Sequence, residues 1–269
     1  MFANARMYAI DAVSAMHWRT LLEWVIAHAD VPVEVIDHPP PAPIASLWQR
    51  SDLACALMCG YPLSRAAPAP IPLAAIVPSP ARYGRRPVYW SDLVVRADSP
   101  WRDVDDVIGK RIAFTVEHSQ SGYQAARRFF AERAHTGGSP RLFEAAIGPL
   151  VTPLDVVQAI VDGDADVGPV DSYAHDLLRR HRPEVAARLR IVASTSPTPI
   201  PPFVASTQTP AHIVEALRGA LVAAGEASEL AATRDALLIA RLKPVVAADY
   251  DMLARLAGEA DALGYARLQ

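Results

Sequence analysis

The chain has 269 residues, 51% of them hydrophobic, and its 26 basic and 29 acidic residues give a net charge of -3. A chain of this length can bury a sizeable core without disulfides or metal ions, and the composition excludes a wholly disordered protein. The near-neutral charge argues against nucleic acid as a partner, because nucleic-acid-binding domains usually carry a strongly basic face.

The N-terminal segment shows neither the basic stretch nor the long apolar run of a secretory signal. No apolar run approaches the roughly eighteen residues that a membrane span needs. We therefore expect no membrane insertion and a cytoplasmic protein, or a periplasmic one if a leader has been removed. Cys55 and Cys59 lie in one apolar run, and we expect both to be reduced and metal-free.

Apolar periodicity and turn residues predict strands that alternate with helices. In chain order we expect a strand at 6–12, a helix at 17–28, strands at 33–36, 51–59, 71–77 and 88–96, a helix at 101–108, a strand at 111–116, helices at 122–134 and 152–161, a strand at 166–170, a helix at 173–180, a strand at 188–193, and helices at 210–224, 228–239 and 248–263. A short helix is also expected around 47–49. This order indicates an α/β protein with sheets covered on both faces.

The composition shifts near residues 96 and 195. We expect lobe 1 to comprise 1–95 and 196–269, and an inserted lobe 2 to comprise 96–195. Two α/β lobes joined by two crossings would leave a cleft between them, which is a usual place for a small ligand.

Common catalytic and metal-binding signatures are missing from the sequence. It contains no Gly-x-Ser-x-Gly elbow, no His-Glu-x-x-His pair, no phosphate-binding loop and no Gly-x-Gly-x-x-Gly. The eight histidines do not pair at ligand spacing on a helix. We therefore expect no catalytic residue, no metal and no cofactor.

The most informative segment is 117–123, where a predicted strand gives way to a helix. The first amides of a helix have no partner within it, and the helix dipole favours negative charge there. Ser119 and Ser121 add hydroxyl groups, and Gly122 allows close approach to the backbone. This pattern predicts a seat for a phosphate, phosphonate, sulfonate or carboxylate. The alternative is that one of the serines only caps the helix.

Further candidates lie at other junctions between strands and helices. Tyr61 follows a buried strand and could close over a ligand or pack at the edge of a lobe. Asp171 and Ser172 precede a helix, where the acid either caps it or contacts the ligand. His17 and Trp18 follow the first strand and could form an aromatic wall or belong to the core.

Several segments together resemble one known family of solute-binding proteins. They are 59–61 (Cys-Gly-Tyr), 94–100 (Val-Val-Arg-Ala-Asp-Ser-Pro), 105–113 (Asp-Asp-Val-Ile-Gly-Lys-Arg-Ile-Ala), 118–123 (His-Ser-Gln-Ser-Gly-Tyr), 162–168 (Asp-Gly-Asp-Ala-Asp-Val-Gly) and 171–173 (Asp-Ser-Tyr). The sequence is similar to the phosphonate-binding, PhnD-like branch of the type II periplasmic solute-binding proteins of ABC importers. The resemblance covers nearly the whole chain, and the Ser-x-Ser-Gly segment points to the phosphonate-type branch.

The resemblance implies a two-lobed fold that binds a small oxyanion without catalysis and delivers it to an ABC permease, with the protein itself a monomer. In this family the Ser-x-Ser-Gly turn holds the oxyanion, and a tyrosine and an acid complete the site. By motif match the oxyanion would be held by Ser119, Gln120, Ser121 and Gly122, and Tyr61 and Asp171 would complete the site. Tyr123, the next residue, is a further candidate ligand contact.

Two other functions are open on the same scaffold: a cytoplasmic enzyme of the menaquinone- or thiamine-precursor type, and a ligand-sensing domain. Under the solute-binding hypothesis, Gly122→Asp should abolish ligand binding and leave the unliganded fold largely intact, because the residue is expected to line the cleft.

Overall fold

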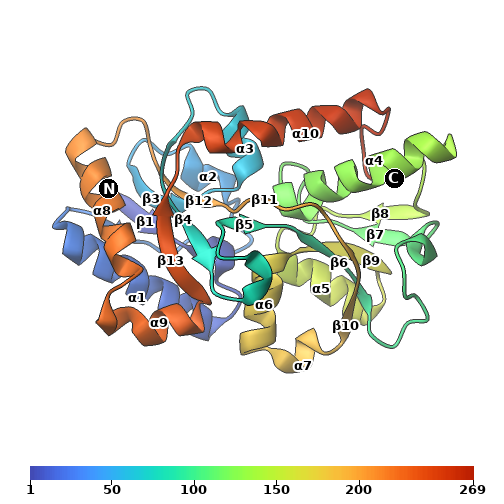
Figure 1. The fold of residues 1–269 in the computed structure, drawn as a ribbon, viewed down its shortest axis with the longest axis horizontal. Coiled ribbons are helices and arrows are strands. Elements are labelled where there is room, and N and C mark those ends of the chain that lie inside the picture. Colours follow the sequence, from blue (N-terminus) through green and yellow to red (C-terminus); the bar gives the residue numbers. More distant parts are fainter. The chain divides into compact units, whose positions relative to one another are not determined.

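A computed structural model describes residues 1–269, which form two compact units (Figure 1). Unit 1 comprises Met1–Val88 and Pro199–Asp251, and unit 2 comprises Tyr89–Thr198 and Met252–Gln269. The boundaries expected near 95 and 195 differ from these by several residues. The C-terminal residues also differ, since they return to unit 2 in a third crossing where lobe 1 was expected to continue.

A buried arginine explains why the C-terminus belongs to unit 2. Arg127 is 3% exposed, and its guanidinium donates to Asp261 Oδ1 at 2.6 Å, to the Tyr265 carbonyl at 3.0 Å and to the Ala257 carbonyl at 2.8 Å. Tyr265 and Leu268 are also part of the hydrophobic core of unit 2. These partners lie some 130 positions away from Arg127 in the sequence, so local pattern could not reveal them.

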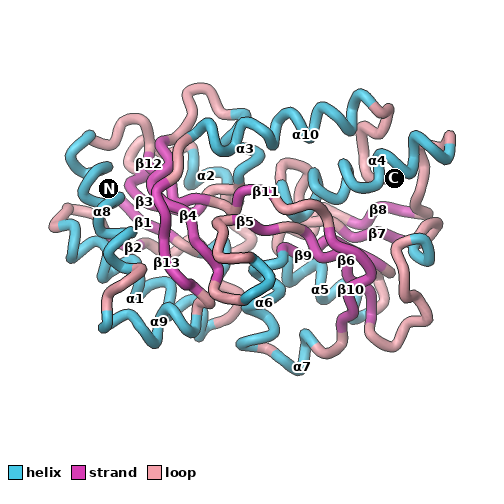
Figure 2. The backbone as a smooth tube through the Cα atoms, viewed as in Figure 1, coloured by secondary structure: helices cyan, strands magenta, loops and turns pink.

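Unit 1 is built on a six-stranded sheet, seen in magenta in Figure 2. Its strand order is β13 (Ile239–Pro244), β4 (Ile71–Pro78), β12 (Pro202–Ala205), β3 (Leu53–Leu57), β1 (Phe2–Asn4) and β2 (Glu34–Val35). β1 is parallel to β2 and β3, whereas β12 is antiparallel to β3 and β4, and β13 is antiparallel to β4. The helices of this unit are α1 (Ala12–Ala29), α2 (Ala45–Trp48), α3 (Gly60–Arg65), α8 (Ala211–Ala224) and α9 (Ala231–Ala236).

The first helix of unit 1 begins earlier than the sequence predicted. Asp11 caps it: its carboxylate accepts from the Ser14 amide at 2.7 Å, and the Ser14 hydroxyl accepts from the Asp11 amide at 3.0 Å. This reciprocal capping box satisfies two amides and starts α1 at Ala12, where a loop was expected. The apolar face of α1, including Leu21 and Val25, is fully buried.

The structure corrects one strand prediction in unit 1 and adds two strands that the sequence analysis missed. The strand expected at 6–12 lies instead at Phe2–Asn4 and is followed by a 3₁₀ turn at Arg6–Tyr8, because the Asn4 side chain accepts from the Arg6 amide at 3.0 Å and ends the strand. β12 and β13 were missed, since the last third was expected to be mainly helical. β12 is buried but bordered by prolines, and β13 is an edge strand with only two buried positions.

Unit 2 is built on a five-stranded sheet with the order β10 (Leu189–Ser194), β6 (Ser91–Arg96), β9 (Val167–Asp171), β7 (Arg111–Ala113) and β8 (Ala145–Ile147). β7 is parallel to β8 and β9, whereas β6 is antiparallel to β9 and β10. Its helices are α4 (Ala125–Gly137), α5 (Pro153–Asp162), α6 (Ser172–His181), α7 (Pro183–Ala186) and α10 (Asp251–Ala262), which starts at the last residue of unit 1. A short pair of strands, β5 (Val88–Tyr89) and β11 (Thr198–Pro199), completes the fold.

One edge of the unit 2 sheet collects the segments that the sequence singled out. The carboxyl ends of β7 and β9 lie at this edge because the two strands are parallel, and β6 begins there because it runs antiparallel to β9. The segment after β7 leads to Ser119, and α6 follows β9 directly. Across both units, none of the helices is long and apolar enough to cross a membrane.

Candidate functional site

The helix after β7 begins with a π-helical turn, η4 (Gln120–Gln124), which runs directly into α4. The Gln124 amide donates to the Ser119 carbonyl at 3.0 Å, five residues back. Such turns are rare in proteins and are often found at functional sites. The amides that open the helix have no acceptor within it, and they carry the positive end of its dipole. The predicted helix at 122–134 thus starts two residues earlier, immediately after Ser119.

Ser119 caps this helix, as the alternative interpretation proposed. Its Oγ accepts a hydrogen bond from the Gly122 amide at 3.0 Å. A serine hydroxyl that accepts in this way still carries one hydrogen that it can donate. Ser119 is partly exposed, so capping and contact with an anion are compatible at this residue.

Gly122 is required by close packing below the turn. A Cβ on this residue would lie 2.0 Å from Thr115 Oγ1 and 3.0 Å from Ser119 Oγ. No side chain fits there without displacing its neighbours. The expectation that Gly122→Asp would leave the unliganded fold largely intact is therefore wrong, because the residue packs on a buried threonine. Thr115, whose buried hydroxyl has no hydrogen-bond partner, was not recognised from the sequence.

The Ser121 hydroxyl is engaged within unit 2. It donates to Asp171 Oδ2 at 3.1 Å, while the Ser121 carbonyl accepts from Ser91 Oγ at 2.6 Å. The sequence predicted a hydroxyl that would add a donor for an anion. In this structure its hydrogen points to the carboxylate, so Ser121 offers a ligand its backbone amide.

Asp171 and Ser172 support the same edge of the sheet. Asp171 Oδ1 accepts from the amides of Tyr173 and Ala174 at 2.9 and 3.0 Å, which is the geometry of a helix cap. Ser172 is fully buried, and its Oγ accepts from the Trp90 amide at 3.1 Å. The structure thus shows Asp171 as a helix cap that also contacts Ser121, and it gives Ser172 a structural contact.

Tyr123 belongs to the core of unit 2. Its ring is 3% exposed and packs edge-on against Phe114 with 5.1 Å between the ring centroids. Its hydroxyl accepts from the Leu268 amide at 3.2 Å, and burial raises the pKa of this phenol. The phenol ring therefore packs into the core and presents no face to a ligand. Gln120 is also buried, and its side chain lines a pocket of about 180 Å³ together with Arg128.

The remaining candidates lie in unit 1. Trp18 is 2% exposed, and its indole donates to the Tyr8 carbonyl at 3.0 Å, so it is a core residue as the alternative interpretation held. His17 is partly exposed, with Nδ1 3.5 Å from Thr233 Oγ1. Tyr61 is partly exposed in the first turn of α3, a helix that the sequence analysis did not predict.

Residues 115–124 include no lysine or arginine. The segment contains one histidine, His118, and loss of solvation lowers the pKa of its imidazole. The neutral ring therefore predominates at pH 7. Within this segment, the groups that can hold an anion are amides, a hydroxyl and the helix dipole.

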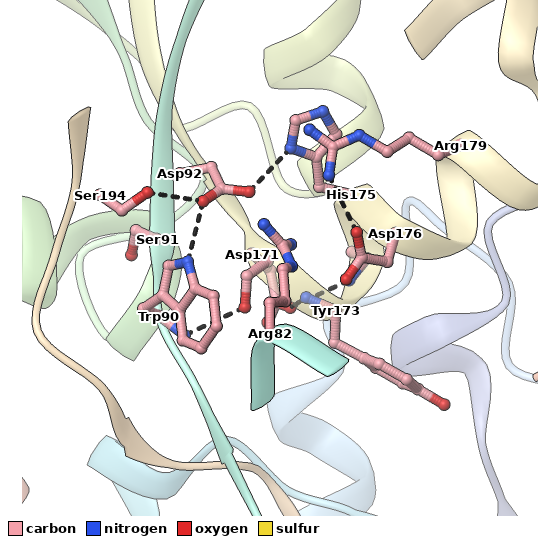
Figure 3. Close-up of polar contacts among 12 residues, drawn as sticks. Arg82, Trp90, Ser91, Asp92, Asp171, Tyr173, His175, Asp176, Arg179 and Ser194 are labelled. Atoms are coloured by element: carbon pink, nitrogen blue, oxygen red, sulfur yellow. Dashed lines mark hydrogen bonds and ion pairs between the residues drawn. The ribbon is translucent and has the colours of Figure 1, made fainter. Parts of the chain in front are cut away.

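The structure also shows a buried polar network beside the seat that sequence reasoning missed. Figure 3 shows Asp92 at its centre, with Trp90, His175 and Ser194 directed toward the carboxylate. The available signal was a pair of polar residues, Ser91 and Asp92, directly before the apolar run Leu93–Val95 of the same strand. Buried polar residues are informative because burial without partners is costly.

No cluster of three or more histidine, cysteine or acidic residues has the geometry to hold a metal ion. Cys55 and Cys59 are both buried and unbridged. Burial raises the pKa of the Cys55 thiol to about 12, so this thiol carries no charge at neutral pH.

Three kinds of comparison place the chain among known proteins. The family model described as "ABC transporter, phosphonate, periplasmic substrate-binding protein" matches residues 12–250. No curated protein matches the sequence significantly. Solved structures similar to this one include a binding protein component of an ABC phosphonate transporter from Pseudomonas aeruginosa, with a TM-score of 0.81 and 16% identity over 100% of this chain and 90% of that chain.

Two further solved structures carry ligands. PhnD1 from Prochlorococcus marinus in complex with methylphosphonate has a TM-score of 0.76 and 14% identity, over 97% of this chain and 98% of that chain. The alkanesulfonate-binding protein SsuA from Xanthomonas axonopodis pv. citri, bound to MOPS, has a TM-score of 0.64 and 17% identity, over 98% and 92%. At these identities the likeness concerns the fold.

Proposed function

The chain belongs to the family of periplasmic substrate-binding proteins of phosphonate ABC transporters, and on that premise we propose that it binds a small phosphonate-type oxyanion at Ser119–Gly122. The family makes it a non-catalytic solute-binding protein whose partners are a small ligand and a membrane permease. The choice of ligand rests on the Ser-x-Ser-Gly turn at the start of a helix. The chain that contains this turn matches the family model over residues 12–250.

The proposed donors are the hydroxyl of Ser119 and the backbone amides that open η4, including that of Ser121. A tetrahedral oxyanion accepts several hydrogen bonds at once, and the helix dipole adds a favourable field. Three other side chains then act mainly as structural supports, because they form hydrogen bonds with one another or with the backbone. They are Ser121, Asp171 and Ser172. Gly122 allows the turn its close packing.

Tyr61 and His17 are the candidates that unit 1 offers to the ligand. Both are partly exposed and both carry a group that forms hydrogen bonds. Tyr123 and Trp18 are not included, because their rings are buried in the cores of their units.

We infer the compartment, the oligomeric state and the partner of this protein from the pattern of its family. We place the protein in the periplasm, as a monomer that passes its ligand to an ABC permease. No metal or cofactor takes part in the proposed binding, and neither nucleic acid nor membrane insertion is involved.

Thermal melting against a panel of small anions tests the ligand. The panel contains methylphosphonate, 2-aminoethylphosphonate, phosphate, ethanesulfonate and acetate. A ligand at about one hundred times its dissociation constant adds roughly 2.7 kcal/mol of apparent stability. We expect a phosphonate to give the largest shift, and a panel without any shift would refute the proposed ligand class.

Two serine variants locate the seat. Ser119→Ala removes the hydroxyl at the seat, and Ser206→Ala removes a similar bond in unit 1, where Ser206 Oγ accepts from the Gln208 amide at 3.2 Å. Ser206 lies beside the start of β3, since its amide donates to the Leu53 carbonyl at 2.8 Å. We expect Ser119→Ala to lose the ligand-induced shift and Ser206→Ala to keep it. Equal shifts in both would place the seat elsewhere.

A further inference from the structure

A buried histidine and a buried aspartate join two elements of unit 2. His175 lies on α6 and Asp92 on β6, and their side chains are 2% and 0% exposed. His175 Nδ1 lies 2.9 Å from Asp92 Oδ2 (Figure 3). Because an ionised carboxylate only accepts hydrogen bonds, Nδ1 carries the hydrogen in this contact.

Asp92 receives two more donors on its other oxygen. Trp90 Nε1 donates to Oδ1 at 2.9 Å, and Ser194 Oγ donates to the same atom at 2.8 Å. The carboxylate thus ties together β6, β10 and α6. A buried carboxylate is tolerated only when it is paired and hydrogen-bonded, and apolar residues of similar size often serve stability as well or better. The network therefore calls for a reason beyond stability.

The same elements hold both polar ends of Ser121. Ser91, next to Asp92 on β6, donates its hydroxyl to the Ser121 carbonyl at 2.6 Å. Asp171, the residue before α6, accepts the Ser121 hydroxyl at 3.1 Å. One contact comes from β6 and the other from the last residue of β9, which pairs with Ser91 in the sheet and also caps α6. The His175–Asp92 pair fixes α6 against β6, and a shift of α6 would act on its cap, Asp171, and so on the contact to Ser121.

We propose that His175 and Asp92 are positioning residues of the oxyanion seat, which hold β6 and α6 in the register that fixes Ser121 at the start of η4. The inference rests on the proposed function for the role of the seat, while the positioning itself is a property of the unliganded protein. Neither residue touches the ligand. Their effect passes through Ser91 and Asp171 to the backbone that supplies the donors.

Two substitutions of the histidine separate hydrogen bonding from packing. His175→Leu fills a similar volume without a donor, whereas His175→Asn keeps a side-chain N–H close to the position of Nδ1. His135→Leu, on the exposed end of α4, is the matched control. We expect amide hydrogen exchange in residues 117–124 to become about tenfold faster in His175→Leu, as the loss of a charge-assisted bond implies. His175→Asn should stay within about threefold of the parent, His135→Leu should match it, and exchange in α8 of unit 1 should not change.

Methylphosphonate is the ligand probe for the same variants. We expect its dissociation constant to rise about tenfold in His175→Leu and to be largely restored in His175→Asn. If the parent protein does not bind methylphosphonate, the proposed ligand fails, and the exchange data alone decide the positioning role. Unchanged exchange in 117–124 for His175→Leu would overturn that role. So would a His175→Asn variant as impaired as His175→Leu, because packing would then explain the effect.

Ser91→Ala keeps the inference testable if His175→Leu does not fold. This variant removes the hydroxyl that reaches the Ser121 carbonyl and leaves the pair between Asp92 and His175 in place. We expect faster exchange in 117–124 with little change in β6. No acceleration in this segment would overturn the proposed route from the pair to the seat.

Discussion

The two units differ most at the junctions where a buried strand leads into a helix. In unit 1, β3 is followed by α3, a helix of 6 residues whose N-cap Cys59 makes no side-chain capping bond. In unit 2, β7 leads to η4, which Ser119 caps and which continues into the 13 residues of α4. Only the unit 2 junction combines a hydroxyl, a close-packed glycine and a long helix dipole. We therefore place the proposed anion site in unit 2.

The strands themselves show the same contrast. β3 reads Leu-Ala-Cys-Ala-Leu and is buried at every position without a charged residue. β6 is equally buried at its start, yet it begins with Ser91 and Asp92, and both make hydrogen bonds to other elements. In unit 1, β3 is held by apolar packing. In unit 2, polar groups are buried around one edge of the sheet. Variants in both units test whether that difference is functional.

The largest effect is expected at the glycine of the unit 2 junction. Gly122→Ala should lower the free energy of unfolding by about 3 kcal/mol and weaken methylphosphonate binding, because the new methyl group overlaps Thr115. Gly219→Ala in α8 of unit 1 meets no atom within 4 Å and should stabilise the protein by about 0.5–1 kcal/mol. Urea denaturation of both variants measures the difference.

A double mutant shows whether Thr115 is the cause. Thr115→Ala removes the atoms that the new methyl group would meet, so Thr115→Ala combined with Gly122→Ala should be more stable than Gly122→Ala alone. Residues in direct contact give interaction energies of about 0.5–3 kcal/mol in such cycles. Additive effects would mean that some other contact excludes a side chain at Gly122.

Much of this contrast could be predicted from the sequence. The strand-to-helix junction at 117–123 and its serine cap follow from local pattern, as does the capped helix at Pro153–Asp162. The roles of Ser121 and Tyr123 could not be predicted, because their partners, Asp171 and Leu268, lie 50 and 145 positions away. The same holds for the return of the C-terminus to unit 2. At these positions local pattern indicated the element that each residue belongs to, but it did not identify the neighbour that occupies its polar atoms.

A second prediction separates stability from binding within unit 2. Asp166 lies just before β9, at the end of that strand opposite to Asp171, and accepts from Arg111 Nη2 at 2.9 Å, from Arg111 Nε at 3.0 Å and from the Arg111 amide at 2.9 Å. Asp166→Asn should cost about 2 kcal/mol at pH 7, as expected for hydrogen bonds to a charged group. Methylphosphonate binding should not change, because this pair lies away from the seat.

The pH dependence of that cost has a defined sign. Burial alone would raise the pKa of Asp166, but the hydrogen bonds from Arg111 outweigh it and the pKa is lowered from 3.8. The carboxylate therefore contributes stability above its unfolded pKa and loses it as the pH falls through the lower folded value. The difference between parent and Asp166→Asn, measured by urea denaturation, should shrink as the pH falls below about 4. Asp98→Asn is the control, because its 69% exposed side chain pairs with Arg96 at the surface and should cost less than about 1 kcal/mol at any pH.

The smallest effects on stability compare one helix cap from each unit. Asp11 caps α1 through the Ser14 amide, and Asp171 caps α6 while also accepting the Ser121 hydroxyl. Replacing either with alanine should cost about 1 kcal/mol, the usual value for a lost cap. Only Asp171→Ala also frees Ser121, so only this variant should weaken methylphosphonate binding, by about tenfold for a lost charge-assisted bond. Calorimetric titration of both variants measures the affinity. If the two bind methylphosphonate equally well, the bond between Asp171 and Ser121 does not support the seat, and the contrast between the units is one of stability alone.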